Sequence, residues 1–240
     1  MRTLLFLTME QASTPRPLPR GPHGLERDVV LASQRGRMLG AMADAVAAKG
    51  YVATTVADVV AGAGVSRKTF YEHFRDKEEC FLAAYDAGVD LVLEAIVAAR
   101  PAEGDESWIA LTRARVRAYL NTLAANPAFA RTFLIEVFAA GPHALDRRAE
   151  VLRRFAQLFR DLHDEARRQF PELQPVPERI YVGAVGAINE LVSDVAREGR
   201  AAELPELEDT LLFLQVALFA GRDTAASLGL GAPQSATNVS

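Results

Sequence analysis

The sequence predicts an all-α protein, in which an N-terminal helix-turn-helix unit of three helices precedes a larger helical bundle. Three observations support this fold class. Apolar residues recur at helical spacing along most of the 240 residues, no segment alternates as a half-buried strand does, and many prolines fall between the periodic segments. About nine helices are expected. Residues 1–27 and 223–240 lack a packing pattern and are expected to be flexible tails.

The composition is that of an ordinary globular protein, with 50% apolar and 24% charged residues. The formal net charge of −4 means that a nucleic-acid partner would have to be met by a local basic patch. Cys80 is the single cysteine, so no intrachain disulfide is possible. With no convincing secretory signal and no stretch approaching a membrane span, a cytoplasmic location is expected.

The first three expected helices are close together in the sequence, and two of them are short. Residues 32–51 place apolar residues on one face and stop at a glycine. Residues 54–64 begin with Thr55 as the expected N-cap, followed three residues later by the acid of a capping box. Residues 66–74 are expected to be capped by Ser66. This arrangement favours a compact three-helix unit.

The second and third of these helices form a helix-turn-helix pattern, with Gly64 giving the turn its backbone freedom. Phe70 and Phe74 are expected to pack inward, which leaves the start of the third helix facing outward, where it would enter a DNA major groove. Arginine and lysine there can donate to guanine, and threonine can contact a base edge. The candidate DNA-binding residues are Thr55, Ser66, Arg67, Lys68, Thr69, Tyr71, His73 and Lys77.

Residues 50–79, GYVATTVADVVAGAGVSRKTFYEHFRDKEE, resemble the DNA-binding signature of the TetR family of bacterial transcriptional regulators. The resemblance covers about residues 30–100 strongly. It implies a DNA-binding domain at 28–76 and a ligand-binding and dimerisation domain at 77–222. Glu72 departs from the pattern as an acid beside the recognition surface. The resemblance implies base-reading roles for Arg67, Lys68 and Thr69, and phosphate contacts for Thr55, Tyr71, His73 and Lys77.

The second domain is expected to hold a pocket for a largely apolar small molecule, although the same side chains would suit a plain core. His163 lies on the apolar stripe of its helix, as satisfied core histidines often do. Glu136 also lies on an apolar face and needs a partner, either an arginine at 113, 115 or 117 or a cationic effector. The candidate pocket residues are Trp108, Tyr119, Phe133, Glu136, Phe159 and His163.

Six further helices are expected after the first three, and the last two carry apolar stripes that suit a four-helix bundle across a two-fold axis. A dimer would place two recognition helices about 34 Å apart, or a multiple of that, to meet successive major grooves. The expected helices are 77–100, 106–125, 128–140, 143–170, 178–199 and 205–221. The candidate dimer residues are Ala184, Ala187, Ile188, Leu191, Val195, Leu211, Leu214 and Leu218.

The function hypothesis is a homodimer that binds double-stranded operator DNA and represses transcription until an effector enters the pocket. A transcriptional activator, or a helical small-molecule carrier without DNA binding, is the alternative. The sequence has no phosphate-binding P-loop, zinc-protease motif or nucleophile elbow, and its four histidines are scattered. The chain is therefore expected to be no enzyme, and to bind no cofactor, metal or membrane.

Overall fold

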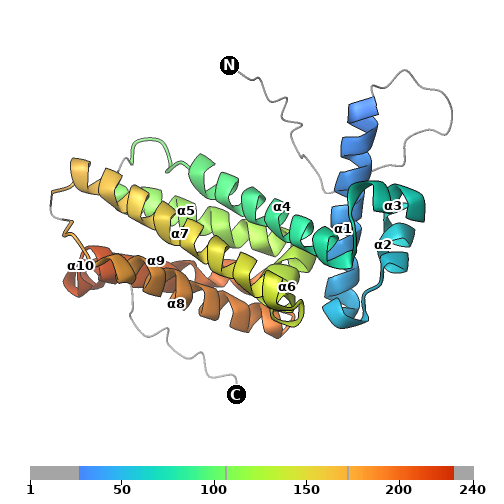
Figure 1. Cartoon of the computed structure of the whole chain (residues 1–240). Coiled ribbons are helices and arrows are strands. Elements are labelled where there is room, and N and C mark those ends of the chain that lie inside the picture. Colours follow the sequence, from blue (N-terminus) through green and yellow to red (C-terminus); the bar gives the residue numbers. More distant parts are fainter. Residues whose placement is uncertain (1–26, 106, 172, 230–240) are drawn as a thin grey trace.

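The computed structural model describes residues 27–105, 107–171 and 173–229. Every regular element within these ranges is helical, which confirms the predicted all-α fold. Figure 1 shows a short unit of α1, α2 and α3 at one end of a longer bundle that contains α4 to α10. Within the described ranges, no helix is both long enough and apolar enough to cross a bilayer. Of the expected tails at 1–27 and 223–240, residues 1–26 and 230–240 lie outside the described residues.

The N-terminal unit consists of α1 (Arg27–Ala53), α2 (Val56–Ala63) and α3 (Arg67–His73). Met38 and Met42 of α1, Val59 of α2 and Phe70 of α3 are fully buried and belong to one core, so the three helices pack as a single unit. Within α1 the backbone kinks at Gly50, where φ is 81°. Glycine takes this left-handed conformation at little cost.

The connections between these helices follow the sequence prediction. Thr55 caps α2 and forms a capping box with Asp58, and Ser66 caps α3 by accepting a hydrogen bond from the Thr69 backbone N–H at 3.0 Å. Gly64 ends α2 in the left-handed region, with φ 62° and ψ 40°. Both caps and the glycine turn are therefore confirmed. Together they fix the angle between α2 and α3.

The bundle is a set of long helices whose inner faces continue the core of the N-terminal unit. Figure 1 shows α4, α5 and α7 running along its length, with α8 and α9 along one side. Its elements are α4 (Lys77–Ala98), α5 (Trp108–Ala125), α6 (Pro127–Leu134), η1 (Glu136–Ala139), α7 (Pro142–Gln169), α8 (Glu178–Arg197), η2 (Ala201–Leu207), α9 (Glu208–Phe219) and α10 (Arg222–Ser227), where η marks a 3₁₀ helix.

Three elements differ from the sequence prediction. The helix expected over 128–140 is α6 followed by η1, with a break at Ile135, where φ is −121°. The helix expected from 205 starts at Glu208, because Pro205 lies inside the 3₁₀ helix η2. Residues 223–227 were expected in a flexible tail but belong to α10 (Arg222–Ser227). The methyl group of Ala225 is fully buried in a cluster with Trp108, which holds this turn of helix in place.

Candidate nucleic-acid interface and effector pocket

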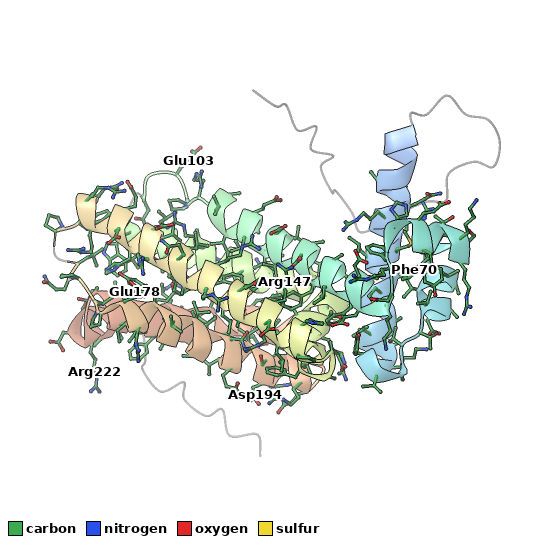
Figure 2. The ribbon with its side chains drawn as sticks, viewed as in Figure 1. Phe70, Glu103, Arg147, Glu178, Asp194 and Arg222 are labelled. Carbon is green, nitrogen blue, oxygen red and sulfur yellow. The ribbon has the colours of Figure 1, made fainter. Side chains whose placement is uncertain are left out.

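The outward face of α3 carries the cationic side chains expected to meet DNA. The Arg67 and Lys68 side chains are exposed, and Tyr71 is 55% exposed, while Phe70 beside them is fully buried. Figure 2 shows Phe70 within the three-helix unit. Figure 1 shows α2 and α3 on the side of α1 away from the bundle. Buried Phe70 therefore fixes a helix whose donors point away from the rest of the chain.

The start of α3 is organised by hydroxyl groups. The hydroxyl oxygens of Ser66 and Thr69 lie 2.9 Å apart, and Ser66 also caps the helix. Glu72 lies 3.9 Å from the Lys68 ammonium, one turn further along the helix. The acid that departs from the family pattern thus forms a weak surface ion pair with a candidate base-reading residue.

The start of α2 is organised around Asp58. The Thr55 backbone N–H and hydroxyl both donate to its carboxylate, at 2.7 and 2.6 Å, and the Lys49 ammonium lies 2.6 Å from it. The Lys49 ion pair and the Thr55 hydrogen bonds hold the pKa of Asp58 far below its usual value. Thr55 itself is exposed at the positive end of α2, where a phosphate oxygen can approach.

Lys77 is placed at the junction between α1 and α4 rather than on the open face of α3. Its ammonium donates to the Tyr51 backbone carbonyl at 2.9 Å and lies 4.1 Å from the centre of the Tyr51 ring. Burial lowers the pKa of Lys77. His73 is half-buried, and its Nε2 has no hydrogen-bond partner in the described part of the chain. The phosphate roles of both residues stay predictions.

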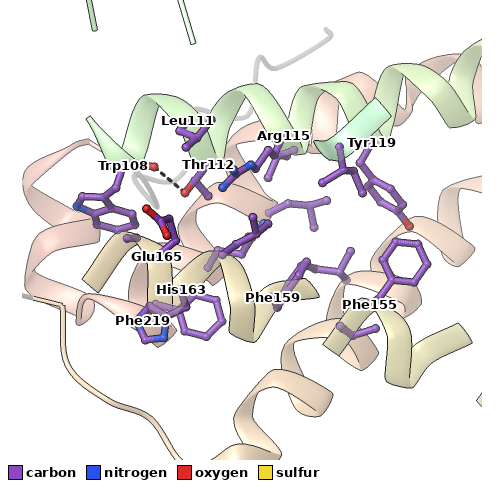
Figure 3. Close-up of a pocket in the computed structure, with 18 of the residues that line it drawn as sticks. Trp108, Leu111, Thr112, Arg115, Tyr119, Phe155, Phe159, His163, Glu165 and Phe219 are labelled. Atoms are coloured by element: carbon purple, nitrogen blue, oxygen red, sulfur yellow. Dashed lines mark hydrogen bonds between the residues drawn. The ribbon is translucent and has the colours of Figure 1, made fainter. Parts of the chain in front are cut away.

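A second site is a cavity of about 130 Å³ inside the bundle. Its walls come from α4 to α9, and aromatic and aliphatic side chains predominate. In Figure 3, Trp108, Arg115 and Tyr119 line one wall from α5, and Phe155, Phe159 and His163 line the opposite wall from α7. Five of the candidate pocket residues line this cavity: Trp108, Tyr119, Phe133, Phe159 and His163.

Glu136 does not line the cavity, so its assignment to the pocket is corrected. Its carboxylate accepts a hydrogen bond from the Tyr51 backbone N–H at 3.0 Å and lies 3.3 Å from an Arg131 guanidinium nitrogen. The break at Ile135 ends α6, and residue 136 therefore no longer shares the inward face of Phe133. Glu136 instead joins the bundle to the end of α1, and none of the three expected arginines is its partner.

Those three arginines on α5 have two different environments. Arg113 donates to Glu208 and Asp209 at 2.9 and 2.7 Å, and Arg117 donates twice to Glu208. Arg115 faces the cavity instead. The sequence contained a signal for this separation, because residue 115 falls on the helical stripe of Trp108 and Tyr119, whereas 113 and 117 share another face.

His163 is a partnered residue that also lines the cavity. Its Nδ1 lies 2.8 Å from the Tyr181 hydroxyl, and its ring lies 4.9 Å from the Phe219 ring centre. Burial, followed by the Arg167 charge, lowers the pKa of His163, so the imidazole is neutral at pH 7. It therefore contributes a neutral polar group to the wall.

The candidate dimer residues divide into two groups. Ala184, Ile188 and Leu211 are buried in the core of their own chain, with 1%, 7% and 1% of their surface exposed. These three assignments are corrected, because a second copy has no access to buried side chains. Leu191 is exposed, and Ala187, Val195, Leu214 and Leu218 are half-buried. On α8 the outward stripe also contains Val182, Gly183 and Gly186.

Known proteins resemble the chain in both sequence and fold. Residues 40–84 match the family model of bacterial regulatory proteins of the tetR family. No curated protein matches the sequence. The fatty acid degradation regulator FadR from Bacillus halodurans has a similar structure, with 19% identity and a TM-score of 0.66, over 76% of this chain and 94% of that one.

Two further solved structures are similar. A tetR-family regulatory protein from Rhodococcus RHA1 is 28% identical with a TM-score of 0.56, over 75% of this chain and 96% of that one. The transcriptional regulator FadR from Bacillus subtilis, solved in complex with stearoyl-CoA, is 16% identical with a TM-score of 0.63, over 78% of this chain and 98% of that one.

The matched residues 40–84 contain α2, the turn at Gly64 and α3, which are the helix-turn-helix described above. The likeness to the Rhodococcus regulator extends over most of the helical bundle as well. Sequence match and fold therefore agree: residues 40–84 match the tetR family of bacterial regulatory proteins, and the fold of the chain is similar to that of a solved tetR-family regulator.

Proposed function

We propose that this chain is a homodimeric transcriptional repressor, which binds operator DNA through α3 and leaves it when a small, largely apolar molecule fills the bundle cavity. The observation that carries the proposal is the pairing of two features in one chain. Arg67, Lys68 and Tyr71 stand exposed on a rigid short helix, and an apolar cavity lies in the bundle joined to it. Repression by DNA binding requires a location in the cytoplasm.

On DNA, the residues at the start of α3 take the base-reading roles. Arg67 and Lys68 donate to guanine acceptors, and Thr69 contacts a base edge or a thymine methyl group. Tyr71, His73, Thr55 and the remaining donor capacity of Lys77 bind phosphates, as does the N-terminus of α2. Ser66 acts by holding the first turn of α3 in its capped conformation.

Release would proceed through α4, which connects the cavity to the DNA-binding unit. Ile96 lines the cavity near the end of this helix, and Lys77 at its beginning is bonded to Tyr51 of α1. A shift of α4 on effector binding would therefore change the spacing of the two α3 helices in a dimer. A coupling free energy of about 1–3 kcal/mol changes operator affinity about 5- to 150-fold.

An apolar effector is supported by the cavity walls and by one similar protein. The walls are predominantly aromatic and aliphatic. FadR from Bacillus subtilis, which shares the fold, was solved with stearoyl-CoA, a molecule with a long apolar chain. The chemistry of the walls suits the apolar part of such a molecule.

The test is DNA binding by single-site variants on the intergenic DNA beside the gene for this chain. Arg67→Ala and Lys68→Ala are expected to weaken binding about 10- to 100-fold, because each loses a contact worth about 1–3 kcal/mol. The matched control is Arg222→Ala, which removes an exposed arginine at the end of the bundle far from Phe70 (Figure 2) and should bind as wild type. Fluorescence anisotropy at several salt concentrations measures these affinities.

Equal binding by wild type, Arg67→Ala and Lys68→Ala would contradict the proposal and favour the alternative of a helical carrier. In vitro transcription from the same DNA distinguishes repression from activation. A repressor lowers the transcript level, and an activator raises it.

A further inference from the structure

Arg115 is a charged side chain in the wall of an otherwise apolar cavity. It lies on the inner face of α5, between Trp108 and Tyr119, and Figure 3 shows it beside Thr112. Its Nε is buried and makes no hydrogen bond to any described residue. No carboxylate of the described residues lies within ion-pair distance, whereas Arg113 and Arg117 on the same helix both bind Glu208.

The other charged side chain of the wall has a partner, and so do the Thr112 hydroxyl and one ring nitrogen of His163. Glu165, the acidic side chain in the wall, is bound by Arg168 and accepts from the Gln169 amide at 3.0 Å. These contacts hold the pKa of Glu165 below its usual value. The Thr112 hydroxyl donates to the Trp108 carbonyl at 2.7 Å, and neutral His163 lies against the Tyr181 hydroxyl. Arg115 therefore carries the uncompensated charge of the cavity.

Arg115 is partly buried, and a charge withdrawn from water without a partner destabilises a protein, so its presence favours a compensating anion. Burial and the nearby charge of Arg100 lower the pKa of Arg115, yet a guanidinium stays protonated at neutral pH. Arg100 adds positive potential, since it also lacks an acidic partner among the described residues. The potential at this part of the wall attracts an anion.

We propose that Arg115 binds the anionic head group of an amphipathic effector, a molecule with a carboxylate or phosphate at one end and an apolar chain at the other. The guanidinium offers parallel N–H donors to either head group. The aromatic and aliphatic walls receive the chain. This inference rests on the proposed role of the cavity as the effector site, and it assigns the chemical class of the effector.

The cavity volume adds a condition on how such a molecule binds. At about 130 Å³ the space is close to that of an engineered cavity of about 150 Å³ that holds benzene. A chain of about ten carbon atoms is larger than benzene, so it fits only if lining side chains or helices move. Ile96 of α4 is among the lining residues, and movement there reaches the helix that begins at the DNA-binding unit.

The test compares ligands that share a ten-carbon chain and differ in their head group. Decanoate, decanol and decyltrimethylammonium are titrated into the full-length protein by isothermal calorimetry. Decanoate is expected to bind wild type about ten- to hundredfold more tightly than decanol, and the ammonium compound most weakly, because a hydrogen bond to a charged group adds that much affinity. Decanoyl-CoA is a fourth ligand, and tighter binding than decanoate would identify phosphates as the head group.

The variants are Arg115→Met, which removes the charge at similar volume, and Arg115→Lys, which keeps it. Arg115→Met is expected to lose the preference for decanoate or decanoyl-CoA over decanol while binding decanol as wild type does. Arg115→Lys is expected to keep part of that preference. Without ligand, Arg115→Met is expected to melt at a higher temperature than wild type, since it lacks the unpaired charge.

Equal binding of decanoate, decanoyl-CoA and decanol by wild type would overturn the inference, as would a full preference for the anion in Arg115→Met. Failure of all four ligands to bind would overturn it as well. Operator binding by the same ligand-free proteins is measured in parallel. Because Arg115 is remote from α3, intact DNA binding in these cases would leave the proposed DNA-binding function standing.

Discussion

Glu136 is one of the residues whose contacts link the bundle directly to the N-terminal unit. The kink at Gly50 frees the Tyr51 backbone N–H from its helix, and the Glu136 carboxylate accepts it at 3.0 Å. A side chain in place of Gly50 would lie 3.3 Å from this carboxylate, in addition to its unfavourable φ. Arg131 partly balances the charge. One side chain thus provides the acceptor for the partly buried Tyr51 N–H and holds η1 against α1.

Replacement of Glu136 by alanine is expected to lower the free energy of unfolding by about 1–3 kcal/mol, because the Tyr51 N–H loses its partner. Glu136→Gln keeps a carbonyl acceptor and loses the Arg131 ion pair alone, so its loss is expected to be smaller. Urea denaturation of the three proteins measures the difference. Equal stability of both variants and wild type would show that the contact does not stabilise the fold.

Some of these residue contacts were predictable from the sequence and others were not. The caps Thr55 and Ser66 were predicted because a capping hydrogen bond depends on residues within one turn of the chain. The partner of Glu136 lies 85 positions away, so no local pattern identifies it. Arg115 lies on the apolar stripe of α5, so its position facing the interior was predictable. Its lack of an acidic partner was not, because that depends on which side chains α7 and α9 place beside it.

At the scale of elements, the packing of α6 against α4 depends on Gly88. A Cβ atom at this position would lie 1.7 Å from a ring carbon of Phe129. Gly88→Ala is therefore expected to destabilise the protein by about 1–3 kcal/mol or more, because α6 must move away from α4. Thermal unfolding measures this loss. The double variant with Phe129→Leu is expected to recover part of it.

Gly40 of α1 provides the control for this substitution. A Cβ atom at this position would have no other atom within 4 Å. Gly40→Ala is expected to raise stability by about 0.5–1 kcal/mol through its helix propensity. If Gly88→Ala raised stability as Gly40→Ala is expected to, the result would contradict the close approach of α6 to α4.

The pairing of α5 with α9 makes stability depend on pH through Glu208. Hydrogen bonds from Arg117, and then from Arg113, lower the pKa of Glu208 from its usual 4.5 in the folded state. Its contribution is thus fully present above about pH 4.5 and is lost as the pH falls through the folded-state pKa. Wild type is expected to exceed Glu208→Gln by about 1–2 kcal/mol at pH 7, with the difference shrinking below pH 4.5. Melting curves between pH 3 and 7 test this, and a constant difference would contradict it.

The boundaries of the elements show what periodicity alone misses. The apolar stripe of 128–140 predicted one helix because Phe129, Phe133 and residue 136 have helical spacing. The helix instead breaks at Ile135, and Glu136 therefore lies at the contact with α1. The small residues of α10 have the composition of a flexible tail, so the sequence did not indicate a helix there. Ala225 is buried because Trp108 and Leu212 surround it, and those contacts come from distant segments.

At the scale of the whole molecule, the proposed dimer needs a surface that the single chain leaves open. Val182 on the outward stripe of α8 is 52% exposed, and a methyl group added at Gly183 or Gly186 beside it would meet no atom within 4 Å. A second helix can therefore approach α8 closely at this stripe. Ala184, Ile188 and Leu211 were chosen from the sequence because an apolar stripe looks the same whether it faces its own core or a partner.

Val182→Arg is expected to convert the proposed dimer to a monomer of 26.1 kDa, because it places an unpaired charge in the proposed interface. Light scattering coupled to size-exclusion chromatography measures the mass. Val97→Arg, at a position 53% exposed on α4, is the matched control and should leave the mass unchanged. If the Val182→Arg variant were still a dimer, the interface could not lie on this stripe of α8.

The hydrogen bond between Tyr51 and Glu136 also gives the protein a reporter at a single position. The Tyr51 amide proton is protected from exchange with solvent as long as η1 stays seated on α1. The exchange rate of this amide, measured by NMR or mass spectrometry, therefore reports whether η1 and α1 are in contact. Faster exchange with effector than with operator would show that release begins by separating them.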